Sequence, residues 1–184
     1  MATSGSKSVT VTSWDTLRFT WEEKSQSIPT NTTTITWKLQ LIATSDGAIN
    51  SSASKTWTVT INGTQYTGTN TVGIGNNSTK TLASGTTTIG HNTDGTKTFN
   101  YSFSQQFDIT FNSWIGTISG SGSGTLDTIP RKSSLTASNG TLGTSQTLTI
   151  SRNSASFTHT ITYKCGTASG TIATKTTGTS VSWT

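Results

Sequence analysis

Apolar side chains alternate with polar ones along most of this chain, and the polar positions are mostly Thr or Ser. The clearest example is residues 34–41, TITWKLQL, in which every second side chain is Ile, Trp or Leu. A period of two places alternate side chains on opposite faces of a β-strand, and Thr suits a pleated surface because it is β-branched. The pattern therefore predicts an all-β chain whose sheets pack on one face and contact solvent on the other.

Turn signals separate these alternating segments at intervals of about ten residues, which predicts roughly eight to ten strands before residue 119. Asn62-Gly63 indicates a tight type I′ hairpin, and Asp94-Gly95 indicates a second hairpin turn. Many short strands with regular turns favour an antiparallel β-sandwich, either a jelly roll or an immunoglobulin-like fold.

A change of composition predicts a second module after this sandwich. Residues 119–124 contain only Ser and Gly, which indicates either a flexible segment or a strand with a glycine edge. Pro130 lacks an N–H donor and favours an extended conformation at the residue before it. The expected organisation is a β-sandwich domain over residues 1–128, a linker over 129–134 and a partial immunoglobulin-like β module over 135–184.

The second module is expected to be small or truncated. About fifty residues are marginal for an independent core without disulfides or a metal. Its strands are short, and Asn139-Gly140 predicts a turn among them. Either a partner chain completes this module or the natural protein continues past Thr184, and we favour the second alternative.

Composition indicates a folded chain with a thin core. Apolar residues make up only 29% of the sequence, but charge is low and there are six Trp and six Phe, whereas disordered chains are rich in charge and poor in aromatics. The single cysteine, Cys165, excludes an intrachain disulfide. Residues 1–7 lack the apolar segment of a secretory signal, and no apolar run approaches the ~20 residues of a membrane span. We therefore expect no membrane partner. We also expect that the chain is made in a cytoplasm and is not exported, or alternatively that a leader has been removed from it.

Charge is distributed unevenly between the two expected modules. Residues 1–128 carry seven Lys or Arg and seven acids, whereas residues 129–184 carry five Lys or Arg and no acid, so the whole net charge of +5 lies in the second part. A basic module attracts anionic partners such as a cell wall or a nucleic acid. Nucleic acid is disfavoured as a partner, because the five cations are dispersed and not interleaved with aromatic residues.

The sequence does not predict a catalytic site, a metal site or a cofactor. The two histidines, His91 and His159, fall in different modules, and the adjacent Glu22 and Glu23 would point to opposite faces of a strand. Around His91 there are too few carboxylates for Ca²⁺ and no companion Cys or His for Zn²⁺. We therefore do not expect an enzyme.

Aromatic residues outside the regular alternation are the best candidates for a binding site. Three tryptophans are in phase with apolar neighbours and are expected in the core: Trp21, Trp37 and Trp57. Trp14 and Trp114 are out of phase, and Tyr66 follows the Asn-Gly turn, so these three are candidates for exposure unless a β-bulge returns them to the core. An exposed aromatic ring stacks on a sugar while a carboxylate such as Asp15 bonds its hydroxyls. The candidate carbohydrate-binding residues are therefore Trp14, Asp15, Tyr66 and Trp114.

Several segments resemble a known family. Residues 81–89, TLASGTTTI, followed by residues 91–98, HNTDGTKT, look like a recurring segment of tail-associated minor structural proteins in siphoviruses of Gram-positive bacteria. Residues 128–134, TIPRKSS, resemble the joint that follows that segment, and residues 151–163 resemble the opening of the next repeat. The resemblance implies a virion tail component at the tip or fibre, made in the host cytoplasm. It implies no catalytic residues.

Two hypotheses of function follow. The first is a bacteriophage tail structural protein, a homo-oligomer in the virion, that contacts other tail proteins and the glycan of the host cell wall during attachment. The alternative is a carbohydrate-binding module of a secreted or cell-surface protein. Exposure of the out-of-phase aromatic residues in one coplanar strip would favour the alternative.

Overall fold

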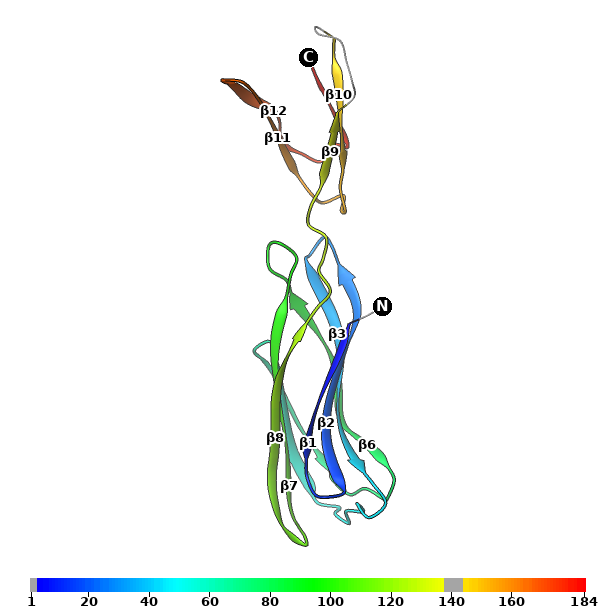
Figure 1. Cartoon of the computed structure of the whole chain (residues 1–184). Coiled ribbons are helices and arrows are strands. Elements are labelled where there is room, and N and C mark those ends of the chain that lie inside the picture. Colours follow the sequence, from blue (N-terminus) through cyan, green and yellow to red (C-terminus); the bar gives the residue numbers. More distant parts are fainter. Residues whose placement is uncertain (1–2, 138–143) are drawn as a thin grey trace.

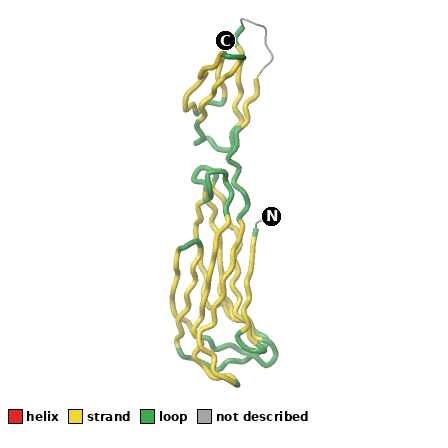
Figure 2. Tube along the Cα trace, turned by 60° about the vertical axis from the view of Figure 1, so that its left-hand side comes forward, coloured by secondary structure: helices red, strands yellow, loops and turns green. Residues whose placement is uncertain are grey.

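The structure is a computed structural model that describes residues 3–137 and 144–184, and over these residues it contains strands and loops but no helix (Figure 2). All paired strands are antiparallel. The prediction of an all-β, antiparallel sandwich-type fold is therefore confirmed. The predicted Asn139-Gly140 turn lies outside the described residues.

The strands form two lobes that lie end to end (Figure 1). The first lobe contains β1 (Ser4–Thr10), β2 (Asp15–Ser27), β3 (Thr32–Ala43), β4 (Ser54–Ile61), β5 (Thr64–Thr71), β6 (Thr79–Gly90), β7 (Thr98–Phe111) and β8 (Ser113–Thr125). The second lobe contains β9 (Ser134–Ala137), β10 (Gln146–Ser151), β11 (His159–Cys165), β12 (Ala168–Thr176) and β13 (Ser180–Trp183). Residues 126–133 connect the lobes, and among the described residues no sheet is shared between them.

The first lobe is a sandwich of two four-stranded sheets, ordered β1-β2-β3-β6 and β5-β4-β7-β8. Alternation in the sequence explains the packing, because most inward positions of β2 and β3 are apolar and most outward positions are polar. Aromatic rings fill the middle of the core: the ring centroid of Phe19 lies 4.8 Å from that of Tyr101 and 5.6 Å from that of Phe103. A few large side chains thus provide a core that the low apolar content would not otherwise supply.

Glycines recur opposite aromatic residues in neighbouring strands. The pairs found among the described residues are Gly5 with Trp21, Gly68 with Trp57, Gly85 with Trp37, Gly120 with Phe103, Gly122 with Tyr101, Gly124 with Phe99 and, in the second lobe, Gly170 with Tyr163. A Cβ atom at any of these glycines would lie 2.5–2.8 Å from an aromatic side chain. Residues 119–124 are therefore the interior of β8, and the alternative expectation of a flexible segment there is wrong.

The two predicted turns have different outcomes. Asn62 and Gly63 have φ angles of 48° and 84° and join β4 to β5, as a type I′ hairpin requires. Asp94-Gly95 is not a hairpin turn, because β6 pairs with β3 and β7 pairs with β4 and β8. The segment 91–97 instead carries the chain from one sheet of the sandwich to the other.

The second lobe has a much smaller core. Strands β9, β10 and β13 form one sheet in the order β13-β10-β9, and β11 and β12 form a separate hairpin. In the described part of this lobe, the buried core consists of Leu148, Ile150 and Ile161. Leu135 and Trp183 remain 51% and 41% exposed, so much of the apolar surface of this lobe contacts solvent.

Candidate functional site

The end of the first lobe that faces away from the second lobe, called the distal end below, is built from loops. They are residues 11–14, 44–53 and 72–78 and the β7–β8 turn at Asn112 (Figure 1). Backbone bonds tie the three longer loops together: Thr44 N–H donates to the Trp14 carbonyl at 2.9 Å, and Ile49 and Ile74 exchange two bonds of 2.9 Å. The distal end is therefore a fixed surface on which exposed side chains hold their positions.

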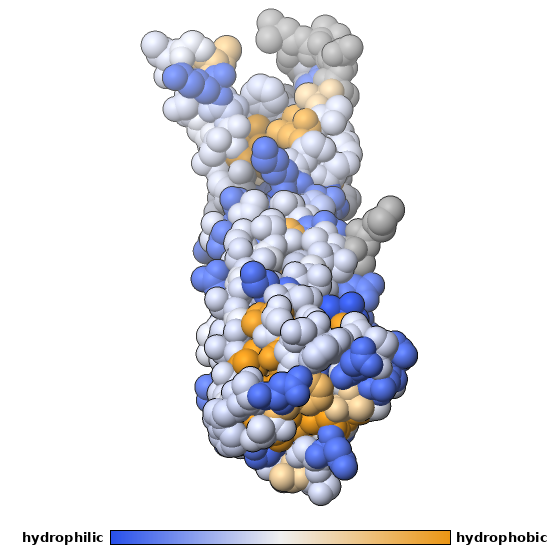
Figure 3. All heavy atoms as spheres, turned by 60° about the horizontal axis from the view of Figure 1, so that its bottom comes forward, coloured by the Kyte–Doolittle hydropathy of each residue, from blue (hydrophilic) through white to orange (hydrophobic). Residues whose placement is uncertain are grey.

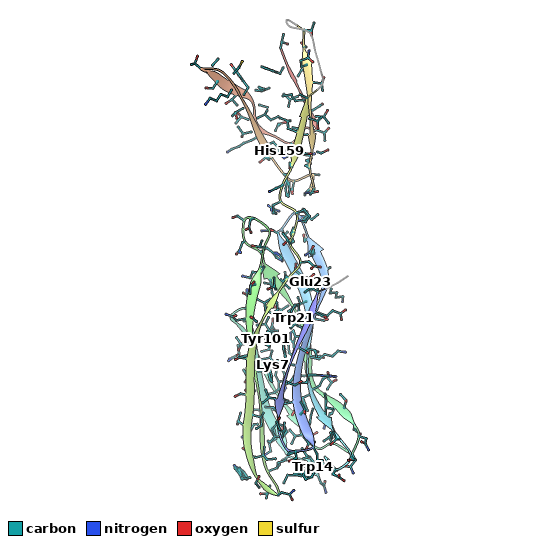
Figure 4. All side chains as sticks on the ribbon, viewed as in Figure 1. Lys7, Trp14, Trp21, Glu23, Tyr101 and His159 are labelled. Carbon is teal, nitrogen blue, oxygen red and sulfur yellow. The ribbon has the colours of Figure 1, made fainter. Side chains whose placement is uncertain are left out.

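Trp14 is half-buried at this end (Figure 4). Its ring meets that of Phe111 edge to face, with the centroids 5.8 Å apart and the planes at 67°. This geometry is a favourable one for two aromatic rings. The ring of Trp14 thus packs partly against β7, so Trp14 is neither fully exposed nor part of the buried core.

Asp15 is buried, with only 1% of its surface exposed. Its Oδ2 accepts a bond of 2.7 Å from the Thr12 hydroxyl, while Oδ1 is buried without a hydrogen-bond partner among the described residues. Burial raises the pKa of the Asp15 carboxyl, and the bond from Thr12 opposes that shift. The structure thus places Asp15 inside the sandwich and not at the surface, and its expected contact with sugar hydroxyls stays a prediction.

Tyr66 lies away from the distal end, on β5 and against the sandwich core. Its ring centroid is 5.3 Å from that of Trp37, and its side chain is half-buried. The structure therefore does not bring Tyr66 and the two out-of-phase tryptophans into one coplanar strip.

Trp114 is the exposed member of the predicted set, with 67% of its surface accessible. It is the second residue of β8, directly after the turn, and pairs with Thr110 of β7. The next residue, Ile115, is buried, so Trp114 must face the opposite side of the strand. Figure 3 shows hydrophobic residues gathered at this end of the molecule. An indole held in this way can stack on a flat apolar face such as that of a sugar ring.

A second cluster lies at the other end of the first lobe, where the two lobes join. Ile129 is fully buried, and its N–H donates to the Gly95 carbonyl at 3.0 Å. The Asp127 N–H donates to Glu23 Oε1 at 2.6 Å. Glu23 is itself 7% exposed, and burial raises the pKa of its carboxyl. The connecting segment is thus fixed to the first lobe through its backbone.

His91 supports this joint from within the loop 91–97. Its Nδ1 lies 2.7 Å from the Gly95 carbonyl, which can only accept, so Nδ1 carries the proton. Its Nε2, 2.7 Å from the Thr33 hydroxyl, then accepts from that group in the neutral imidazole. The role of His91 is therefore to hold the loop against which Ile129 packs.

Arg131 connects the two lobes directly. Its Nη1 donates to the Ile28 carbonyl of the first lobe at 2.7 Å, and its guanidinium lies 4.5 Å from the centroid of the Phe157 ring of the second. Beside it, a cavity of about 490 Å³, called the joint cleft below, is lined by Arg131, Ser133, Ser156, Phe157, Thr158 and His159. Sequence reasoning missed this cleft, although the basic and hydroxyl-bearing residues of both segments are visible in the sequence.

The described part of the chain, residues 3–137 and 144–184, has no group of three or more His, Cys, Asp or Glu side chains that could hold a metal ion. His91 and His159 lie in different lobes, as expected from their positions in the sequence. Among the same residues, no helix is long and apolar enough to cross a bilayer. What the surface offers is an exposed indole at the distal end and a basic, hydroxyl-lined cleft at the joint.

Comparison with known proteins gives one match. No curated protein matches the chain, and no solved structure matches it. A family model described as "Siphovirus protein of unknown function (DUF859)" matches residues 15–184, which include strands β2 to β13 and the joint between the lobes. The resemblance to siphovirus proteins is thereby confirmed, and the chain belongs to this siphovirus protein family.

Proposed function

We propose that this chain is a structural module of the siphovirus virion tail, located at the tip or fibre, that takes part in attachment to the host cell wall. The observation that carries the proposal is the end-to-end arrangement of two β lobes whose connection is fixed by the buried Ile129 and by Arg131 (Figure 1). Such an arrangement holds the distal end of the first lobe away from the second lobe. A module of this kind works by contact and requires no reaction.

The surface is suited to contact with a cell wall at both ends. Trp114 offers an exposed indole at the distal end. The second part of the chain carries the whole net charge of +5, which attracts anionic wall polymers. Other tail proteins and further copies of this chain are the proposed partners within the virion.

Glycan binding is a second candidate function, and the exposure of Trp114 is the observation that favours it. Only one of the four residues predicted for this role is well exposed, so the contact would be a single stacking interaction rather than an aromatic strip. We therefore treat glycan contact as part of attachment and not as a separate activity.

Immunogold electron microscopy of purified virions, with antibodies raised against this chain, tests the location. We expect labelling at the distal end of the tail. Labelling of the capsid, or intact virions without label, would contradict the proposal. Attachment is tested separately by adding the purified chain to host cells before infection, and we expect it to slow phage adsorption. If phage adsorption is unchanged at a saturating concentration of the purified chain, the proposed role in attachment is excluded.

A further inference from the structure

The joint cleft has the shape and chemistry of a small anion site. Its lining contains one guanidinium, from Arg131, one imidazole, from His159, and the hydroxyls of Ser133, Ser156 and Thr158. These groups come from two separate segments of the sequence, the connecting segment and residues 156–159, which end at the first residue of β11 (His159 is labelled in Figure 4). All of them can donate hydrogen bonds, and the guanidinium matches the geometry of a phosphate.

The charge around the joint cleft favours an anion. Residues 129–184, which supply every residue of its lining, contain no Asp or Glu. Arg152 adds a second guanidinium nearby, because its Nη1 donates to the Phe157 carbonyl at 3.3 Å. Lys132 follows Arg131 directly and is exposed. A cleft that is lined by a guanidinium, and whose lining contains no carboxylate, attracts anions.

One hydrogen bond of the His159 ring joins the two segments that line the joint cleft. Its Nε2 lies 2.7 Å from the Ser133 hydroxyl oxygen, and its Nδ1 is buried without a partner among the described residues. In the neutral tautomer with the proton on Nδ1, Ser133 donates to Nε2, and in the neutral tautomer with the proton on Nε2, the imidazole donates to Ser133. In the second tautomer, the Ser133 hydroxyl proton is available to a ligand.

Arg131 is held in position before any ligand arrives. One of its N–H groups donates to the Ile28 carbonyl, and its plane lies over the Phe157 ring. A guanidinium has five N–H donors, so this anchoring bond leaves others for a second acceptor. A guanidinium that is already fixed in position loses less conformational entropy on binding than a mobile side chain does.

We propose that the joint cleft binds the phosphate groups of a polyol phosphate polymer, with Arg131 and the hydroxyls of Ser133 and Thr158 as its ligands. This inference rests on the proposed attachment to the host cell wall and names the chemical class of the wall component. The hydroxyl-rich lining suits a chain whose repeating unit alternates phosphate with alcohol groups.

Single-stranded nucleic acid carries the same phosphodiester but fits the joint cleft less well. Such ligands are held by aromatic rings on which bases stack. The cleft contains one ring, Phe157, and the Arg131 guanidinium already covers a face of it. A polyol phosphate needs no stacking partner, so it is the ligand to which we commit.

Nuclear magnetic resonance titration of the isotope-labelled full chain with a synthetic glycerol phosphate oligomer tests the inference. We expect saturable shifts at the amides of residues 131–134 and 156–159, reversed by excess inorganic phosphate and not by an uncharged sugar. Arg131→Gln should weaken binding about tenfold or more, because it removes a charge-assisted bond. The matched control, Lys164→Gln, removes one charge from an exposed position on β11 outside the cleft, and we expect it to weaken binding less than about twofold.

Arg131→Gln also removes a contact between the lobes, so a second variant is needed. Thr158→Val deletes one hydroxyl from the exposed rim of the joint cleft and should weaken binding a few-fold at an unchanged melting temperature. Equal losses for Arg131→Gln and Lys164→Gln, unchanged binding by Thr158→Val, or tighter binding of a DNA oligonucleotide would overturn the inference. If the oligomer fails to bind while the chain still slows phage adsorption, the cleft inference falls and the proposed function stands.

Discussion

Trp37 and Gly85 face each other across β3 and β6, and the indole of Trp37 occupies the space that a side chain at Gly85 would need. A Cβ atom at Gly85 would lie 2.8 Å from Cζ2 of the indole. Trp37 is itself 2% exposed and contacts the rings of Phe19, Trp57 and Tyr66. The glycine is therefore part of the core packing, although it contributes no side chain.

Replacing Gly85 by Ala tests this relationship. We expect a loss of about 1–3 kcal/mol in the free energy of unfolding, because the indole must move within a packed core. The measurement is denaturant unfolding followed by tryptophan fluorescence. Gly90→Ala is the matched control in the same strand, since a Cβ atom there has no neighbour within 4 Å. Equal losses in the two variants would show that backbone effects, and not contact with Trp37, decide the result.

Replacing Gly95 by Ala should reduce stability more than replacing Gly63, a glycine with a similar φ angle. Gly95 and Gly63 have φ angles of +87° and +84°, so Ala is strained at both. A Cβ atom at Gly95 would also collide with the Ile129 carbonyl, whereas one at Gly63 would meet nothing within 4 Å. We therefore expect Gly95→Ala to cost at least about 1 kcal/mol more than Gly63→Ala. Limited proteolysis should also cut the connecting segment 126–133 faster in Gly95→Ala only. Equal stability and equal cleavage of the two variants would contradict the packing of Ile129 on this loop.

Local alternation predicts strands such as β3, but not the pairings of all strands. Asp94-Gly95 has the chemistry of a hairpin turn, yet β6 pairs with β3, which lies far away in the sequence. Strand pairing across a sandwich depends on contacts between distant segments, and a dipeptide carries no information about them. Asn62-Gly63 was predicted correctly because its two neighbouring strands do pair with each other.

The candidate site was predictable only in part, for reasons that differ from residue to residue. Asp15 has the same phase as Leu17 and Phe19, so alternation already placed it inward, but its charge suggested the surface. Trp114 is exposed because the turn at Asn112 restarts the alternation in β8, and its out-of-phase position was a useful signal. The joint cleft could not be predicted, because nothing local shows that residues 131–134 lie beside residues 156–159.

Trp114→Ala should weaken attachment to host cells while leaving the stability of the fold nearly unchanged. The side chain is 67% exposed, so we expect the free energy of unfolding to change by less than about 0.5 kcal/mol. Competition with phage for host cells should be weakened if the indole contacts the wall. Trp183→Ala is the control, because Trp183 is also exposed but lies on the second lobe. Unchanged competition by Trp114→Ala, or an equal loss in Trp183→Ala, would exclude a specific role of the distal end.

Asp15→Asn should become more favourable, relative to the native sequence, as the pH rises from low to neutral values. Burial raises the pKa of Asp15 in the folded state above its ordinary value of 3.8. Between pH 3.8 and this raised pKa, the folded state therefore binds more protons than the unfolded state. Stability of the native sequence must then fall as the pH rises through this interval. An Asn side chain can still accept the bond from Thr12 and carries no charge to bury, while its amide N–H groups lie where Oδ1 has no partner, at a cost that does not vary with pH.

The stability of the Asn variant relative to the native sequence should therefore be lowest below about pH 4 and rise by on the order of 1 kcal/mol above the raised pKa of Asp15. Denaturant unfolding of both proteins between about pH 3.5 and pH 7 measures the difference. Glu23, whose pKa is also raised by burial, is present in both proteins, so its contribution cancels in the comparison. A difference that does not vary with pH would mean that the buried carboxyl stays protonated throughout, or that the amide makes new contacts in its place. An advantage that grows towards low pH would reverse the sign and show that the carboxylate is stabilised in the fold.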